Sequence, residues 1–317
     1  MYNTFISLIT VIHKPADLRL LVPFLEVVDP LMKENFTDYE IIFINNLPGC
    51  NLAEAIKNIK KEIKNQVFIL NLSTAINKNQ AIIAGLDRSN GDYTVVFELE
   101  FALHPELILQ LFEKTREHYD IVYLKGKGAK VSWRYQLFYR FFYFLLRNYS
   151  TLKIDAQAYN TRIISRRALN SLLKLRENLR YMKAIYSIVG FNTTFLETDV
   201  AFPKESEENF TERFKTALIA ITSFTTFLNT FMLWLFILSL SFLIGVVTNA
   251  LVFKFTGADF FGNTQEAPPG WTFLVILISI FFAVTCLNLY IMSIYLANIY
   301  HEIKKRPLYI IESVQRP

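Results

Sequence analysis

The sequence is poor in cysteine and has no concentrated basic segment. Its 317 residues include two cysteines, Cys50 and Cys286, which lie far apart in a predicted loop and a predicted apolar helix. Such a pair argues against a disulfide framework. The net charge is +5, without the dense basic stripe that is typical of nucleic acid binding. We therefore exclude nucleic acid as a partner and favour anionic lipid headgroups.

Two long segments near the C-terminus contain no Asp, Glu, Lys, Arg or His. They are Thr216–Phe253 and Ala267–Tyr300. A helix needs about 20 apolar residues to cross a bilayer. Each segment therefore predicts one transmembrane helix, at residues 227–252 and 271–297, with a short extracytoplasmic loop between them. The alternative is a pair of buried helices in a soluble core, although apolar runs of this length are the usual membrane signal.

The N-terminal segment Met1–Pro15 lacks a basic leader, and its short apolar run has the pattern of a strand. We expect the N-terminal domain to stay on the side of the membrane where it is made. Lys304, Lys305 and Arg306 follow the second predicted crossing, and basic residues are enriched on the cytoplasmic side. These features predict a multi-pass protein of the inner (plasma) membrane whose N-terminal domain and tail, residues 301–317, are cytoplasmic.

The first hundred residues alternate between strand-like and helix-like segments. The predicted strands are Thr4–Ile12, Tyr39–Asn45, Gln66–Leu72 and Asp92–Glu100. The predicted helices between them are Ala16–Asn35, Asn51–Ile63 and Asn79–Ser89. Strands buried on both faces and separated by helices indicate an α/β fold with a parallel sheet. Ligands bind beyond the carboxyl ends of the strands in such sheets.

Polar side chains fall at two of these strand ends. Asn45 and Asn46 end the second predicted strand, and Glu98 and Glu100 end the fourth. Residues i and i+2 of a strand point to the same face, so we expect the two glutamates to be able to share a divalent cation. Hard cations such as Mg²⁺ prefer carboxylate oxygens. His104 is a further candidate ligand, although a lone histidine in a loop is more often only solvated.

Ser132–Ser150 combines many aromatic residues with basic residues and contains no acidic ones. Arg134, Arg140 and Arg147 recur in it at near-helical spacing. This pattern is typical of an amphipathic helix that lies in the headgroup plane, with its arginines toward phosphates. The alternative is an ordinary buried helix with a few solvated arginines. A second, juxtamembrane amphipathic helix is predicted at residues 209–226.

Several segments resemble a known family in their order and residues. They are "YEIIFINN", "TRIISRRAL", "PPGWT" and the tail "YLANIYHEIKKRPLYII". They are similar to segments of the membrane-anchored family-2 glycosyltransferases that act on polyprenyl phosphate, the dolichol-phosphate-mannose synthase and bacterial GtrB type. The resemblance covers almost the whole chain. It implies a glycosyltransferase (GT-A-like) α/β domain with a mostly parallel sheet over residues 1–208, a membrane region over 227–300, and a homo-oligomer, commonly a tetramer.

The resemblance also implies an activity and its site residues. The activity is transfer of a sugar from a nucleotide-sugar to polyprenyl (undecaprenyl) phosphate at the cytoplasmic membrane face. Glu98 and Glu100 stand where the family has the Asp-x-Asp pair that holds Mg²⁺ or Mn²⁺, and Asn45 and Asn46 stand where it has donor-binding aspartates. Asp155 is the candidate base or orienting acid. The candidates for binding the diphosphate and the lipid phosphate are Lys125, Lys127, Lys130, Arg134, Arg140 and Arg162.

The departures from the family gather at the donor site and leave two hypotheses open. Pro15 stands where the family has an acidic residue, and Ala102 and Leu103 replace a glutamine and an aspartate. One hypothesis is an active glycosyltransferase with an altered donor site. The other is a catalytically inactive glycosyltransferase-like subunit that binds lipid or scaffolds an active partner.

Overall fold

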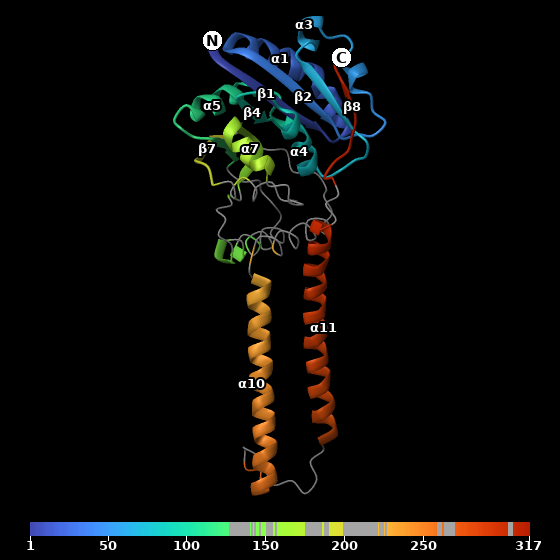
Figure 1. Ribbon diagram of the computed structural model, residues 1–317, viewed down its shortest axis with the longest axis vertical. Coiled ribbons are helices and arrows are strands. Elements are labelled where there is room, and N and C mark those ends of the chain that lie inside the picture. Colours follow the sequence, from blue (N-terminus) through green and yellow to red (C-terminus); the bar gives the residue numbers. More distant parts are fainter. Residues whose placement is uncertain are drawn as a thin grey trace.

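The computed structural model describes most of the α/β part of the chain and two long C-terminal helices. The described residues are 1–126, 140, 142, 144–145, 147–149, 155, 157–174, 186, 190–198, 221, 225, 227–258, 262, 270–303 and 307–317. Figure 1 shows the two long helices extending from the α/β part, to which the C-terminus returns. Most of the predicted helices at 209–226 and 132–150 lies outside the described residues.

A sheet of eight strands forms the centre of the described α/β part, in the order β7-β5-β6-β4-β1-β2-β3-β8. The strands are β1 Tyr2–Ile12, β2 Phe36–Asn45, β3 Val67–Leu72, β4 Tyr93–Val96, β5 Ile121–Gly126, β6 Ala158–Ser165, β7 Thr193–Thr198 and β8 Ile311–Gln315. β4, β1, β2 and β3 run parallel. β6 is antiparallel to both β4 and β5, and β8 is antiparallel to β3. The predicted α/β fold with a mostly parallel sheet is confirmed.

Helices connect the strands and cover the sheet. They are η1 Pro15–Leu20, α1 Leu21–Asn35, α2 Leu52–Ala55, α3 Lys61–Lys64, α4 Lys78–Arg88, η2 Leu99–Phe101, α5 Glu106–Thr115 and α7 Arg166–Lys174. One predicted helix, Asn51–Ile63, is wrong as a continuous element. It is broken into α2 and α3, and Lys60 between them has φ −54° and ψ 138°, which is not helical.

Apolar side chains form a core on each side of the sheet. One cluster packs α1 and α5 against it and includes Phe24, Phe43 and Leu111. The other packs α4 and α7 and includes Ile9 and Ile44. Gly85 of α4 lies so close to the sheet that an added Cβ would be 2.5 Å from Ile9 Cγ2. This close packing fixes α4, and therefore the position of its first residue, Lys78, relative to the strand ends.

The segment after β4 differs from the prediction. β4 ends at Val96, so the predicted strand to Glu100 is wrong beyond that residue. Glu98 is extended and caps the 3-10 turn η2, which contains Glu100. The buried Phe101 follows Glu100 in this turn, and its backbone N–H donates to Glu98 O at 2.9 Å. Burial of this aromatic ring stabilises the turn, so the two carboxylates do not share one face of a strand.

The C-terminal region contains two long helices and an edge strand. α10 spans Phe227–Thr256 and α11 spans Gly270–Ile303, close to the predicted crossings. Within the part of the chain that the structure describes, no helix meets the length and apolarity that a membrane span requires. After α11 the chain returns to the sheet as β8, where Arg316 donates to Asn65 O at 2.6 Å and lies over the Phe68 ring.

Candidate functional site

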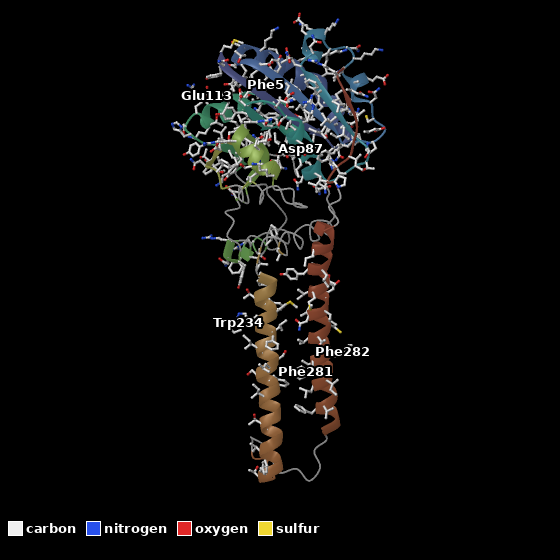
Figure 2. All side chains as sticks on the ribbon, viewed as in Figure 1. Phe5, Asp87, Glu113, Trp234, Phe281 and Phe282 are labelled. Carbon is white, nitrogen blue, oxygen red and sulfur yellow. The ribbon has the colours of Figure 1, made fainter. Side chains whose placement is uncertain are left out.

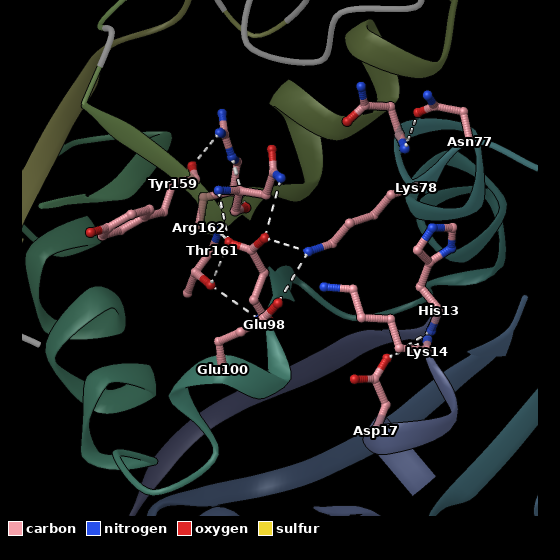
Figure 3. Close-up of polar contacts among 12 residues, drawn as sticks. His13, Lys14, Asp17, Asn77, Lys78, Glu98, Glu100, Tyr159, Thr161 and Arg162 are labelled. Carbon is pink, nitrogen blue, oxygen red and sulfur yellow. Dashed lines mark hydrogen bonds and ion pairs between the residues drawn. The ribbon is translucent and has the colours of Figure 1, made fainter. Parts of the chain in front are cut away.

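Glu98 lies just beyond the carboxyl end of β4 and is a buried carboxylate. Both of its oxygens have hydrogen-bond partners within the protein. Its Oε1 accepts from Lys78 Nζ at 2.7 Å and from Asn160 Nδ2 at 3.2 Å. Its Oε2 accepts from the backbone N–H groups of Asn160 and Thr161 at 3.0 and 3.2 Å. The Thr161 hydroxyl lies 3.5 Å from the same oxygen. Figure 3 shows this cluster, in which β6 encloses Glu98 on one side and Lys78 closes the other.

Lys78 bridges the two glutamates of the candidate metal pair. Its ammonium is 2.7 Å from Glu98 and 3.9 Å from Glu100 Oε1. Its side chain is 31% exposed and that of Glu100 27%, against 5% for Glu98. Lys78 is the first residue of α4, after the N-cap Asn77, whose side chain accepts from the Asn79 N–H. The cluster is therefore open to solvent on the lysine side and closed behind Glu98.

A second lysine reaches the cluster from the end of β1. Figure 3 shows the Lys14 side chain extending toward Lys78 and Glu98. Its backbone N–H and that of His13 donate to Asp17 Oδ2 at 2.8 and 2.9 Å, which fixes the turn between β1 and η1. Basic side chains from two elements therefore point to this cluster, and of the two Lys78 contacts both glutamates.

The residues present do not fit a divalent cation in this arrangement. A carboxylate has about four lone-pair sites, and the contacts of Glu98 with Lys78, Asn160 and Thr161 use them. His104 Nδ1 contacts Glu106 Oε1 at 3.0 Å, and metal binding by this histidine stays a prediction. No group of three or more potential metal ligands of the His, Cys, Asp or Glu type occurs among the described residues.

The charge state of Glu98 follows from these contacts. Burial alone would raise the pKa of its carboxyl group. The charge and hydrogen bond of Lys78 and the hydrogen bonds of Asn160 outweigh burial, so the pKa lies below its ordinary value. Glu98 is therefore an ionised carboxylate held by a protein cation.

The two asparagines predicted to bind the donor hold loops together at the strand ends. Asn45 Nδ2 donates to Cys50 O at 2.7 Å and to Asn71 Oδ1 at 2.8 Å. Asn46 Nδ2 donates to Ile76 O at 2.7 Å, and its Oδ1 accepts from the Ile76 N–H at 2.8 Å. Both side chains are buried. An aspartate could not make the donor contacts, so the amides have a structural role here, and donor binding by either stays a prediction.

Lys125 and Asp155 form a second charged pair, at the end of β5. Lys125 Nζ is 3.1 Å from Asp155 Oδ2 and 4.4 Å from the centre of the Phe195 ring. Asp155 also accepts from Tyr123 Oη at 3.1 Å and from the Gln157 N–H at 2.9 Å. Burial alone would raise the pKa of Asp155, but these hydrogen bonds and the lysine hold it below its ordinary value. A carboxylate of this kind orients and neutralises Lys125 better than it accepts a proton.

The other predicted phosphate-binding residues differ in what the structure shows of them. Arg162 is 2% exposed, donates to Tyr159 O at 2.7 Å, and lies 3.7 Å from the centre of the Tyr186 ring. Arg140 is exposed and helical. Lys127, Lys130 and Arg134 lie outside the described residues. The phosphate-binding role of all these residues stays a prediction.

Sequence reasoning missed the residues that complete the cluster around Glu98. These are Lys14, Lys78, Asn160 and Thr161. Lys78 left a usable signal, because it starts a helix at the carboxyl end of a parallel sheet. Cations are disfavoured in the first turn of a helix by the helix dipole, so a lysine there suggests an anionic partner. Asn160 and Thr161 left none, since their contacts depend on the antiparallel pairing of β6 with β4.

Known proteins resemble this chain over most of its length. The model of glycosyl transferase family 2 matches residues 23–173. An uncharacterized glycosyltransferase of Synechocystis sp. is 28% identical, covering 93% of this chain and 90% of that protein. The SfII prophage-derived bactoprenol glucosyl transferase of Shigella flexneri is 30% identical, covering 88% of this chain and 89% of its own.

Among solved structures, glucosyl-3-phosphoglycerate synthase from Mycobacterium tuberculosis, in complex with Mn²⁺ and uridine-diphosphate-glucose, aligns with a TM-score of 0.45. It is 14% identical and covers 69% of this chain and 77% of that one, which is too distant to bear on the site. The sequence relatives are more similar, at 28–30% identity over 88–93% of this chain. The resemblance found in the sequence is confirmed, and the chain belongs to glycosyl transferase family 2, together with the bactoprenol glucosyl transferases.

Proposed function

We propose that this chain is an active glycosyltransferase that moves a sugar from a nucleotide-sugar to a polyprenyl phosphate. The observation that carries the proposal is the similarity to relatives named bactoprenol glucosyl transferases, at 30% identity over 88% of the chain. These relatives favour an active enzyme over an inactive lipid-binding or scaffolding subunit.

The proposed reaction is a single displacement at the sugar. An oxygen of the polyprenyl phosphate attacks the anomeric carbon, and the bond from that carbon to the β-phosphate oxygen of the donor breaks. The nucleoside diphosphate leaves with the electron pair of that bond. The site must stabilise the negative charge that develops on this leaving group. The cluster of Lys14, Lys78, Glu98 and Glu100 lies where parallel sheets bind ligands, so we place the donor diphosphate there.

We also propose that α10 and α11 attach the protein to the inner membrane as two crossings. Both helices lie in the charge-free segments of the sequence. They expose large apolar side chains, among them Trp234 at 66% and Phe282 at 70%. Figure 2 shows these two residues on the outer sides of the helix pair, away from the partner helix. Exposed apolar surfaces of this extent mark membrane or protein contacts.

The acceptor side and the assembly are further parts of the proposal. With the N-terminal domain and the tail cytoplasmic, a lipid phosphate at the membrane surface would meet basic residues below the sheet. Lys125, oriented by Asp155, and Arg140 are the described candidates. Lysine and arginine bind phosphate oxygens by charge-assisted hydrogen bonds. A homo-oligomer, a tetramer by resemblance, remains part of the expectation.

Sugar transfer can be measured with the purified chain in detergent. Radiolabelled uridine-diphosphate-glucose and undecaprenyl phosphate are the first donor and acceptor, followed by other nucleotide-sugars. The expected result is a labelled, organic-soluble glycolipid that forms only when the lipid phosphate is present. If no donor of the panel gives a glycolipid while a purified relative does so in the same assay, the proposed function is wrong.

A further inference from the structure

We propose that the ammonium groups of Lys78 and Lys14 take the place of a divalent cation at the donor site, so that the donor diphosphate binds without a metal ion. The inference rests on the proposed function and adds how its donor is held. It starts from a disagreement: the family resemblance implies Mg²⁺ or Mn²⁺ between two carboxylates, whereas the position between Glu98 and Glu100 belongs to Lys78.

Glu98 already has a full set of partners. Lys78, Asn160 and Thr161 approach both of its oxygens, and four of these contacts are between 2.7 and 3.2 Å. A metal ion would have to displace the lysine ammonium or the backbone N–H groups of β6. Because Glu98 is 6% exposed, the displaced groups would lose their partner in a buried site, which is costly.

The net charge of the cluster is balanced without a metal ion. A divalent cation between two carboxylates leaves the site neutral before the donor arrives. Lys14 and Lys78 together carry the same charge as one such cation. The two carboxylates that they face, Glu98 and Glu100, are those that would hold the cation. The cluster of four side chains is therefore also neutral, and a metal added to it would be repelled by the ammonium 2.7 Å from Glu98. A compact ammonium binds phosphate oxygens as a point charge.

Lys78 is held in place while its side chain remains accessible. Glu98 fixes the ammonium from the closed side, and α4 is fixed by the close approach of Gly85 to Ile9. The side chain is still 31% exposed, so a ligand can reach it from the solvent side. A charge that is oriented before the ligand arrives stabilises a leaving group more effectively than a mobile one. Lys14 comes from another element, the end of β1, and Figure 3 shows its side chain extending toward the same cluster.

Inorganic pyrophosphate tests this inference directly, because it carries the diphosphate group that nucleoside-diphosphate-sugar donors share. Calorimetry on the full chain in detergent is done once with a chelator and once with Mn²⁺. The expected result is binding in chelator that Mn²⁺ does not strengthen. Lys78→Met and Lys14→Met should each weaken it by about tenfold or more. Lys114→Met is the matched control and should bind pyrophosphate normally. Lys114 is not part of the cluster, and its Nζ is 2.6 Å from Glu117 Oε2.

Lys78→Met leaves a buried carboxylate unpaired, so a second variant guards against misfolding. Lys78→Met combined with Glu98→Gln removes both charges of the pair, and should fold while binding pyrophosphate as weakly as Lys78→Met. Electron paramagnetic resonance of added Mn²⁺ gives an independent readout of the unaltered protein. We expect no saturable Mn²⁺ binding that depends on Glu100, so Glu100→Gln should leave the Mn²⁺ signal unchanged.

Three outcomes would overturn the inference: pyrophosphate binding only with Mn²⁺, no pyrophosphate binding in either condition, or a Mn²⁺ site that Glu100→Gln removes. Metal-free pyrophosphate binding that needs Lys78 supports it, even if no sugar is transferred. In that case the proposed function fails and the diphosphate site stands, so the two failures are distinguishable.

Discussion

Asp155 illustrates how single contacts decide what a carboxylate can do. It accepts hydrogen bonds from Tyr123 and Gln157 and is paired with Lys125. Burial, followed by the charge and hydrogen bond of Asp155, raises the pKa of the Tyr123 hydroxyl to about 12. Because the pKa of Asp155 lies below its ordinary value, the group stays ionised throughout the neutral range. We infer that it positions Lys125 and does not take up a proton during turnover.

This assignment predicts the pH profile of Asp155→Asn. The variant should lose sugar transfer by about tenfold, because Lys125 is no longer held in place. The acidic limb of the pH–rate profile between about pH 5 and 8 should keep its midpoint, since a carboxyl with a lowered pKa does not titrate there. Initial rates across this range check the result. Loss of an acidic limb in the variant would instead identify Asp155 as the base.

Asn45 gives a second prediction at the residue scale. An aspartate at this position has no N–H donors and places one carboxylate oxygen against Cys50 O and Asn71 Oδ1. Asn45→Asp should therefore lower the free energy of unfolding by about 1–3 kcal/mol. Asn51→Asp is the matched control, because Asn51 only accepts from the Ala53 N–H as a helix cap and aspartate caps equally well. Urea unfolding followed by circular dichroism compares them, and equal stabilities would contradict the loop-holding role.

At the scale of elements, α4 is the helix that determines the site. Its inner face packs on the sheet through Gly85, and its first residue supplies the lysine of the cluster. The 3-10 turn η2 then brings Glu100 within 3.9 Å of that lysine. A shift of α4 away from the sheet would move the ammonium with it, so packing and ligand binding should change together.

Gly85→Ala tests this coupling. The new Cβ would meet Ile9 Cγ2 at 2.5 Å and Ile44 Cδ1 at 2.7 Å. The free energy of unfolding should fall by about 1–3 kcal/mol through overpacking, and pyrophosphate binding should weaken. Gly245→Ala is the control, since nothing lies within 4 Å of its added Cβ. The free energy of unfolding and the calorimetric binding of pyrophosphate are measured for both variants. A Gly85→Ala variant that is more stable than the unaltered protein would contradict close packing at this position.

At the scale of the molecule, the strands β1 to β4 and the helices between them could be predicted, apart from the break between α2 and α3, because their apolar spacing is local. The position of Glu98 at a strand end could be predicted for the same reason. The departures depend on distant contacts. β8 pairs with β3 across the whole sequence, with Asn71 Nδ2 donating to Ser313 Oγ at 2.9 Å. The turn at Glu100 depends on burial of Phe101, and the lysine bridge depends on how α4 packs.

Sugar transfer in the presence of a chelator tests the central claim most directly. The full chain in detergent is treated with chelator, and radiolabelled uridine-diphosphate-glucose and undecaprenyl phosphate are added. The account predicts that glycolipid forms at an undiminished rate and that Lys78→Met abolishes it, whereas Lys114→Met does not. Transfer that stops in chelator and returns with Mn²⁺ would contradict the account.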